Sequence, residues 1–196
     1  MKKKNVLKPR KIAKQIRSQE TIAIILEATG HLLEKQGLNE ISTTQIAKRA
    51  GVSVGSIYQF FPNKESLVAA LFEFQIKQNM ATINRLFDDM DTLPSNKGIE
   101  LLIHHVCTLY FSKRNFFRNL FVEVGPLHLE DLLVASRQSF FKRIARNIAH
   151  SERKAITITN AVMGVIWANL FSSQATLPTA IVEEELVALV RGYLKP

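Results

Sequence analysis

The feature that most constrains the fold is a pair of very short apolar-periodic segments joined at one glycine. In "ISTTQIAKRAGVSVGSIYQFFPNKESL", from Ile41 to Leu67, the first segment ends at Gly51 and the second is stopped at Pro62. A helix of about two turns does not persist alone in water. Neighbouring helices must therefore hold both segments, and the pattern predicts a helical unit that leaves one side of the second segment free for a partner.

Local signals place the ends of these two helices. Ser42, with a glutamine three residues later, has the spacing of a capping box. Gly51 supplies a left-handed turn, and Ser53 is a suitable N-cap for the next helix. Ile57 and Phe61 lie four residues apart and predict the buried face of that helix.

Further helices are expected on both sides of the pair. Apolar spacing over residues 19–36 predicts a preceding helix that Gly37 ends as a left-handed C′ residue. Pro62 stops the third helix, and Asn63 caps a fourth that runs to about Met90. Later helical patterns cover residues 97–113, 115–123, 127–149, 152–175 and 180–194. No stretch alternates over a strand length, so we expect an all-α fold.

The charge distribution singles out the first third of the chain. The net charge is +9; residues 1–64 hold twelve Lys/Arg against four Glu, and residues 65–196 hold fourteen Lys/Arg against thirteen Asp/Glu. Such asymmetry indicates a polyanionic partner for the first third. A solvated basic tail is the alternative, because Lys2–Arg17 carries most of the excess. As an arm, it would track phosphates or enter a minor groove.

Two short helices joined at a glycine, with a third behind them, form a helix-turn-helix arrangement. The second helix of such a pair lies in the major groove of DNA. Small residues at Ser53, Gly55 and Ser56 allow close approach to base edges. Tyr58 offers a hydroxyl to a phosphate, and Lys64 lies at a helix N-terminus, which favours an anion.

The stretch resembles the DNA-binding signature of the TetR family of bacterial regulators over about residues 20–68. The matching positions are Thr43 or Thr44, Ile46, Ala47, Ala50, Gly51, Val52, Ser53, Gly55, Ile57, Tyr58, Phe61, Asn63, Lys64, Glu65 and Leu67. The resemblance implies an N-terminal three-helix DNA-binding domain followed by a larger helical ligand-binding and dimerisation domain. We expect an arm at 1–17, the DNA-binding domain at 18–66 and the larger domain at 67–196.

The resemblance also implies which residues contact DNA. They are Thr43, Thr44, Ser53, Val54, Ser56, Tyr58, Gln59, Phe60 and Lys64. Val54 and Gly55 carry no side-chain hydrogen-bonding group, so base reading would rest on Thr44, Ser56, Gln59 and DNA shape. Single residues have a structural alternative: Ser53 as a cap, Thr43 as a helix start and Phe60 as packing.

For the larger domain the resemblance implies an apolar cavity for a small-molecule effector. Such cavities hold a few polar groups that fix the ligand. Candidate lining residues are His104, Cys107, Tyr110, Phe111, Phe117, Phe121, Phe141, Asn160, Met163 and Trp167. Ordinary helical core is the alternative for the aromatic members. His104 and His105 are adjacent and point to different faces of a helix, so no metal site is expected.

The resemblance further implies a homodimer on a palindromic DNA operator. Ala155–Val182 contains no charged residue, and Ala161, Gly164 and Ala168 permit close helix approach. The monomer's own core is the alternative for this run. Its polar residues and Pro178 argue against a membrane span.

The leading hypothesis is a cytoplasmic homodimeric repressor, released from double-stranded DNA by a small apolar or aromatic ligand, without a cofactor. An activator of the same fold, or a less specific basic DNA-binding protein without an effector, remains open. No P-loop, GxSxG or HExxH motif is present, so the sequence offers no basis for an enzyme.

Overall fold

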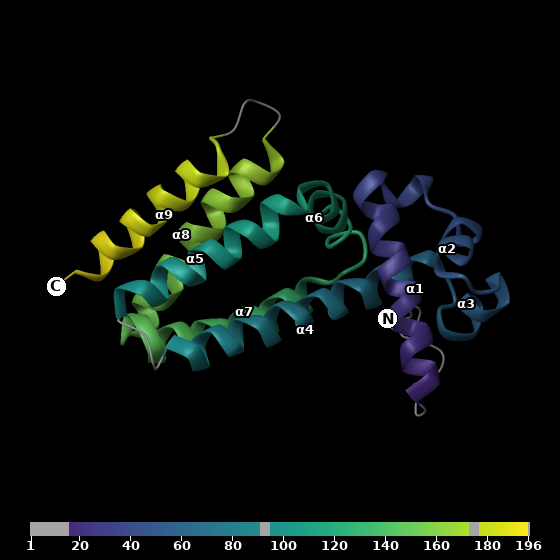
Figure 1. Cartoon of the computed structure of the whole chain (residues 1–196), viewed down its shortest axis with the longest axis horizontal. Helices are drawn as coiled ribbons and strands as arrows, with labels where there is room; N and C mark the ends of the chain where they lie inside the picture. The colour runs from purple at the N-terminus through teal and green to yellow at the C-terminus, as the bar shows by residue number, and fades with distance from the viewer. Residues whose placement is uncertain (1–15, 91–94, 173–176, 196) are drawn as a thin grey trace. The chain divides into compact units, whose positions relative to one another are not determined.

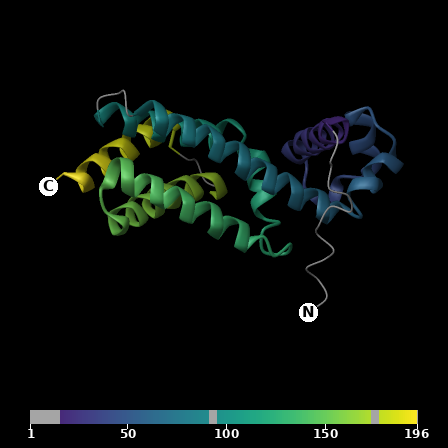
Figure 2. The ribbon, with the colours of Figure 1, turned by 90° about the horizontal axis from the view of Figure 1, so that it is seen from below.

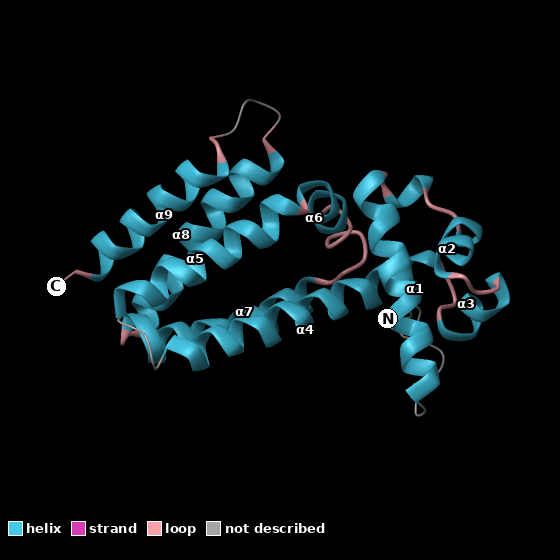
Figure 3. Ribbon diagram, viewed as in Figure 1, coloured by secondary structure: helices cyan, strands magenta, loops and turns pink. Residues whose placement is uncertain are grey.

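The computed structural model describes residues 16–90, 95–172 and 177–195. All regular structure in these ranges is helical, which confirms the all-α expectation (Figure 3). The elements shown in Figure 1 are α1 Ile16–Lys35, the 3₁₀ turn η1 Leu38–Glu40, α2 Thr43–Ala50, α3 Val54–Phe60, α4 Lys64–Met90, α5 Ser95–Ser112, α6 Arg114–Phe121, α7 Glu130–Ile144, the π-helical turn η2 Ala145–Ala149, α8 Glu152–Phe171 and α9 Thr179–Leu194.

Contacts group the chain into two units. The first comprises Met1–Ile76 with Asn115–Asp131, and the second comprises Lys77–Arg114 with Leu132–Pro196. The expected domain division after residue 66 stays a prediction. The grouping by contacts differs from it because α6, although distant in sequence, packs against α1 and the beginning of α4.

The first unit is built around aromatic packing between α6 and its neighbours. The rings of Phe72 and Phe121 meet edge to face at 6.1 Å between centroids. Phe116 is buried, and a Cβ added at Gly30 would lie 3.4 Å from its ring. The Phe116 side chain of α6 therefore packs directly beside Gly30 of α1.

The second unit has its own apolar core. Phe87, Cys107 and Ile166 are fully buried there, and Leu186 contributes from α9. In Figures 1 and 2, α5, α8 and α9 lie side by side, which agrees with their contacts. The ring of Phe140 lies 6.3 Å from that of Phe87, so α7 packs against the second half of α4.

The helix ends differ from the sequence expectation at three places. Gly37 has φ −69° and ψ 163°, which is extended rather than left-handed, and it opens the η1 turn that the sequence pattern missed. The pattern over 127–149 corresponds to a loop, α7 and η2, and the chain turns at His150 with φ 49°. The α8 helix ends at Phe171, where Ser172 adopts an extended conformation.

Candidate nucleic-acid interface

A reciprocal capping box fixes the beginning of α2. The Ser42 backbone N–H donates to Gln45 Oε1 at 2.7 Å, and the Gln45 backbone N–H donates to Ser42 Oγ at 3.1 Å. Ile46 and Ala47 form the buried face of this helix. The helix ends at Gly51, whose φ of 67° lies in the left-handed region as expected. The local sequence signals for α2 are confirmed.

The seven-residue α3 is held from both ends and from beneath. Ser53 Oγ accepts from the Ser56 backbone N–H at 3.0 Å and lies 2.8 Å from Ser56 Oγ. Phe61, just before Pro62, is extended with φ −122° and ψ 113°, which ends the helix. Ile57 and Phe61 are each 1% exposed, so one face of α3 is anchored in the core.

The opposite face of α3 carries hydrogen-bonding side chains at the surface. Tyr58 is 43% exposed, and its hydroxyl lies 3.4 Å from Thr43 Oγ1 at the beginning of α2. Thr44 and Gln59 are also exposed, whereas Val54 is only partly exposed. The structure therefore brings the hydroxyls of Thr43 from α2 and Tyr58 from α3 together.

Phe60 does not belong to that surface. Its side chain is 6% exposed, and its ring lies 6.5 Å from that of Phe61. A ring buried in the core is unavailable to DNA, so the expected contact at Phe60 is corrected to packing. The reason is that two of the seven positions of α3, Ile57 and Phe60, are buried, together with Phe61, which directly follows the helix.

Lys64 is held in a defined position at the beginning of α4. Its Nζ donates to the carbonyl oxygens of Leu38 at 3.2 Å and Ile41 at 2.9 Å. Both carbonyls belong to the α1–α2 connection, residues 36–42. An ammonium group has three N–H donors, so one remains after these two bonds. The sequence did not reveal these partners because they lie 26 and 23 residues away.

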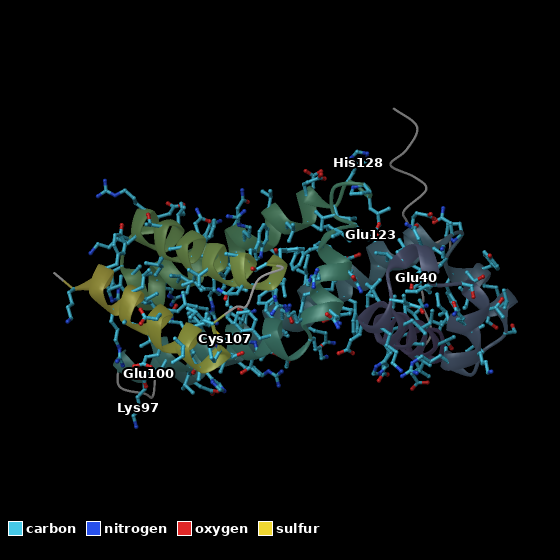
Figure 4. The ribbon with its side chains drawn as sticks, turned by 90° about the horizontal axis from the view of Figure 1, so that it is seen from above. Glu40, Lys97, Glu100, Cys107, Glu123 and His128 are labelled. Carbon is cyan, nitrogen blue, oxygen red and sulfur yellow. The ribbon has the colours of Figure 1, made fainter. Side chains whose placement is uncertain are left out.

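Asn63 caps α4 as the sequence predicts. Its Oδ1 accepts from the Ser66 backbone N–H at 2.8 Å, and Ser66 Oγ donates to the Asn63 carbonyl at 2.8 Å. In the segment after α6, labelled at Glu123 and His128 in Figure 4, burial and the nearby carboxylate of Glu65 raise the pKa of Glu123. Of the basic arm, residues 1–15 lie outside the described residues, and residues 16 and 17 begin α1.

The candidate effector-pocket residues are divided between the two units. Phe117 and Phe121 belong to the first unit, where they stack on each other at 6.1 Å. Tyr110, Phe111 and Met163 border the core of the second unit. These two groups belong to separately packed units.

The remaining candidates divide between the core and the surface of the second unit. Cys107 is fully buried, and burial raises the pKa of its thiol to about 11. Burial raises the pKa of Tyr110 to about 12. Asn160 and Trp167 are exposed on α8, and Phe141 lies beneath the Arg137 guanidinium at 5.6 Å.

A surface concavity between α5 and α9 includes one of the candidates. It measures about 290 Å³ and is lined by Lys97, Glu100, Leu101, His104 and Glu183. Figure 4 shows Lys97 and Glu100 toward the outside and Cys107 among the helices. His104 Nδ1 lies 3.0 Å from Glu183 Oε1. This concavity is open at the surface, whereas the family resemblance implied an apolar cavity among the helices.

Comparisons with known proteins agree with this geometry. Residues 25–71 match the family model described as bacterial regulatory proteins, tetR family. The nucleoid occlusion factor SlmA of Aliivibrio fischeri is 33% identical over 149 residues, covering 71% of this chain and 74% of that protein. The chain belongs to the TetR family. It is accordingly a DNA-binding transcriptional regulator by family.

Two further comparisons cover different shares of the chain. SlmA of Vibrio campbellii is 39% identical over 93 residues, which is 46% of this chain and less than half, 45%, of that protein. A TetR transcription regulator from Haloarcula marismortui has a TM-score of 0.72 at 14% identity, covering 90% of this chain and 97% of that one. The structural likeness shows a shared TetR-type fold across both units.

The α8 helix is long and apolar enough to cross a membrane by length and composition, the one such case among the described residues. Its most apolar window is 33% buried within the chain. Core helices of soluble proteins have the same length and composition. The buried side of α8 includes Ala155, Ile158 and Ile166, and its other side is open.

Proposed function

We propose that this TetR-family regulator acts in the cytoplasm as a homodimeric repressor that places α3 in the major groove of a palindromic operator. The observation that carries the proposal is the surface shared by α2 and α3. It presents the hydroxyls of Thr43 and Tyr58 together, while Ile57 and Phe61 fix the helix from the opposite side.

The proposed DNA contacts divide into two classes. Tyr58, Thr43 and the remaining N–H of Lys64 suit phosphate oxygens, which set register and affinity. Thr44, Ser56 and Gln59 suit base edges, since hydroxyl and amide groups match donors and acceptors in the major groove. Ser53 and Val54 lie where α3 begins and would border the groove. Phe60 is left out because it is buried.

The proposed dimer rests on the open side of α8 and α9. Trp167, Phe171, Ile181, Leu189 and Tyr193 are between 41% and 44% exposed. Gly164 and Ala168 lie on the same side of α8 as Trp167, and a Cβ at Gly164 would meet nothing within 4 Å. Large apolar side chains beside small ones suit close packing with the same surface of a second copy, and two-fold symmetry matches a palindrome.

The proposed effector would bind within the second unit. Thr159 Oγ1, His105 Nε2 and Asn147 Oδ1 are buried there without a hydrogen-bond partner in the part of the chain that the structure describes. Unpaired buried polar atoms are uncommon. A largely apolar ligand with one or two polar groups would supply the missing bonds, and preferential binding to a DNA-incompetent arrangement would release the operator.

The test begins with the DNA. The full chain is used to enrich duplexes from a random-sequence pool, and the enriched sequences are aligned. We expect a single palindromic motif whose half-sites lie about one helical turn, or a multiple of it, apart. Enrichment without a shared motif would favour the alternative of a less specific basic DNA-binding protein, and a motif without two-fold symmetry would contradict the dimeric repressor.

A nucleoid occlusion role is a second candidate. It is favoured by the Aliivibrio fischeri match, which extends over 71% of this chain and so well past residues 25–71. A genome-wide map of binding sites separates the two. Few sites beside genes whose transcripts change in a deletion strain support a repressor. Many dispersed sites with unchanged transcripts, together with septa forming over DNA in the deletion strain, support nucleoid occlusion.

A further inference from the structure

The C-terminal end of α1 lacks the usual means of satisfying its last carbonyl groups. The last four carbonyls of a helix have no intrahelical donor, and a left-handed glycine often supplies a turn that satisfies them. Here Gly37 is extended. The Gln36 backbone N–H bonds to the Leu32 carbonyl at 3.1 Å, but the carbonyls after Leu32 need donors from elsewhere.

A side chain from α6 reaches two of the carbonyls at this end of the helix. Asn119 Nδ2 donates to the carbonyl of Leu33 at 2.6 Å and lies 3.3 Å from that of Gln36. These partners are 86 and 83 residues away in sequence. Asn119 is therefore a long-range C-cap for α1, and nothing in the local sequence marks it.

The position of Asn119 is fixed by the buried face of its own helix. Phe116, Phe117 and Leu120 are between 1% and 4% exposed. Phe116 packs against α1 at Gly30. The amide of Asn119 is thus delivered to the end of α1 by a rigidly packed helix and not by a flexible loop.

Side chains also hold the rest of the α1–α2 connection. Gln36 Nε2 donates to the Glu40 carbonyl at 3.3 Å, and Lys64 Nζ donates to the carbonyls of Leu38 and Ile41. The next residue is Ser42, the N-cap of α2. The hydrogen bonds from Asn119 and Lys64 therefore hold both ends of the α1–α2 connection. The position of this connection determines where α2 begins and where Thr43 meets Tyr58.

We propose that Asn119 is a positioning residue for sequence-specific DNA binding: by capping α1 from α6, it fixes the α1–α2 connection and hence the surface formed by α2 and α3. It touches no DNA itself. This inference rests on the proposed function, because it assumes that α2 and α3 read a specific sequence. It also gives α6 a direct bond to the DNA-reading part of the chain.

The test uses three single variants of the full chain. Asn119→Ala removes the donor. Asn119→Asp keeps the shape but turns a carboxylate toward two carbonyls at the negative end of a helix. Asn115→Ala is the matched control, because Asn115 is exposed on the same helix. Each is titrated with a duplex enriched by the wild-type chain and with a shuffled duplex of the same length, and amide hydrogen exchange is measured without DNA.

We expect Asn119→Ala to weaken binding to the enriched duplex about tenfold, since carbonyls lose their donor, and Asn119→Asp to weaken it further. Binding to the shuffled duplex and the dependence of affinity on salt should stay at the wild-type values, because no phosphate contact is lost. Exchange at the amides of Gln36, Glu40 and Ile41 should accelerate, while exchange in α8 stays unchanged. Asn115→Ala should behave as wild type throughout.

Other outcomes overturn the inference. Faster exchange at the connection with unchanged specific affinity would show that the cap does not position the DNA-reading surface. Equal losses on both duplexes would indicate general destabilisation. If the wild-type chain enriches no sequence, the proposed function fails independently of the cap. Hydrogen exchange then tests whether Asn119 caps α1. Unchanged exchange in the variants overturns the cap, and faster exchange confined to the α1–α2 connection supports it.

Discussion

At the scale of single residues, the functional surface depends on polar groups whose partners are backbone carbonyls or other hydroxyls. Lys64 is the clearest case, because two carbonyls of the α1–α2 connection hold its ammonium group in place. An immobilised cation loses less conformational entropy when it meets a phosphate than a free lysine does. Its contribution to DNA binding should therefore be measurable by itself.

Replacing Lys64 by Ala should weaken binding to both duplexes through the lost phosphate contact and reduce the slope of log affinity against log salt by about 1. Binding to the enriched duplex should weaken more than binding to the shuffled one, because the α1–α2 connection also loses two hydrogen bonds. The measurement is a series of titrations between low and physiological salt. Lys142→Ala is the control, since Lys142 is an exposed lysine of α7 in the second unit. An unchanged slope in Lys64→Ala would assign the lysine to the α1–α2 connection alone.

The partly buried position of His105 makes the stability of the fold depend on pH. Burial, followed by the neighbouring His104, lowers the pKa of His105 below its usual value of 6.5. The unfolded chain then binds a proton at His105 more readily than the folded chain does. The contribution of neutral His105 to the stability of the fold is therefore fully present above about pH 6.5, and it is lost as the pH falls toward the lowered pKa. The melting temperature should drop between pH 7.5 and pH 5.5.

The variant His105→Gln should lose part of that pH dependence, measured as a smaller difference between the two melting temperatures. His31→Gln serves as the control, because His31 is exposed on α1 in the first unit. If the melting temperatures of the wild type and of His105→Gln fall equally between the two pH values, other groups determine the loss of stability in acid.

At the scale of secondary-structure elements, two glycines beside the DNA-reading helices have opposite requirements. Gly51 has φ 67°, where a side chain is strained, and Gly37 has φ −69°, where any residue fits. A Cβ added at either position would meet nothing within 4 Å. Backbone conformation is therefore the main difference between the two sites.

Gly51→Ala should destabilise the fold by about 1 kcal/mol, the cost of a left-handed conformation for an L-residue. Gly37→Ala should be neutral or slightly stabilising, because it restricts the unfolded chain without strain. Chemical denaturation of both variants checks the pair. A similar loss in both would indicate that the connection requires glycine for another reason.

At the scale of the whole molecule, α8 and α9 each have an inner and an outer side. Leu186 and Val190 are buried in the chain's own core, whereas Leu189 and Tyr193 are exposed. Trp167 belongs to the outer side of α8. The only tryptophan therefore reports on this open surface and not on a cavity within the core.

Ala168→Glu should convert the proposed dimer into a folded monomer, because a charge would be buried against apolar side chains of the second copy. Sedimentation should show about half the wild-type mass, and Trp167 emission should shift to the red as water reaches the ring. Ala135→Glu, at an exposed position of α7, is the control. An intact dimer carrying Ala168→Glu would place the interface elsewhere.

The sequence by itself determined the helix-turn-helix in detail. The caps at Ser42, Ser53 and Asn63, the left-handed Gly51 and the stop before Pro62 all appear in the structure as expected. These features depend on residues within about four positions of each other, so their spacing in the chain is nearly their spacing in space. The family signature reflects the same local physics.

Only the tertiary structure decided the rest. It buried Phe60, gave Lys64 two carbonyl partners and capped α1 with Asn119. It also assigned the aromatic residues of α6 to the first unit and those bordering the other core to the second. Each outcome depends on which helices meet, and these partners lie tens of residues apart in the chain. Periodicity shows that a residue is apolar and shares a helix face, but packing alone determines what covers that face.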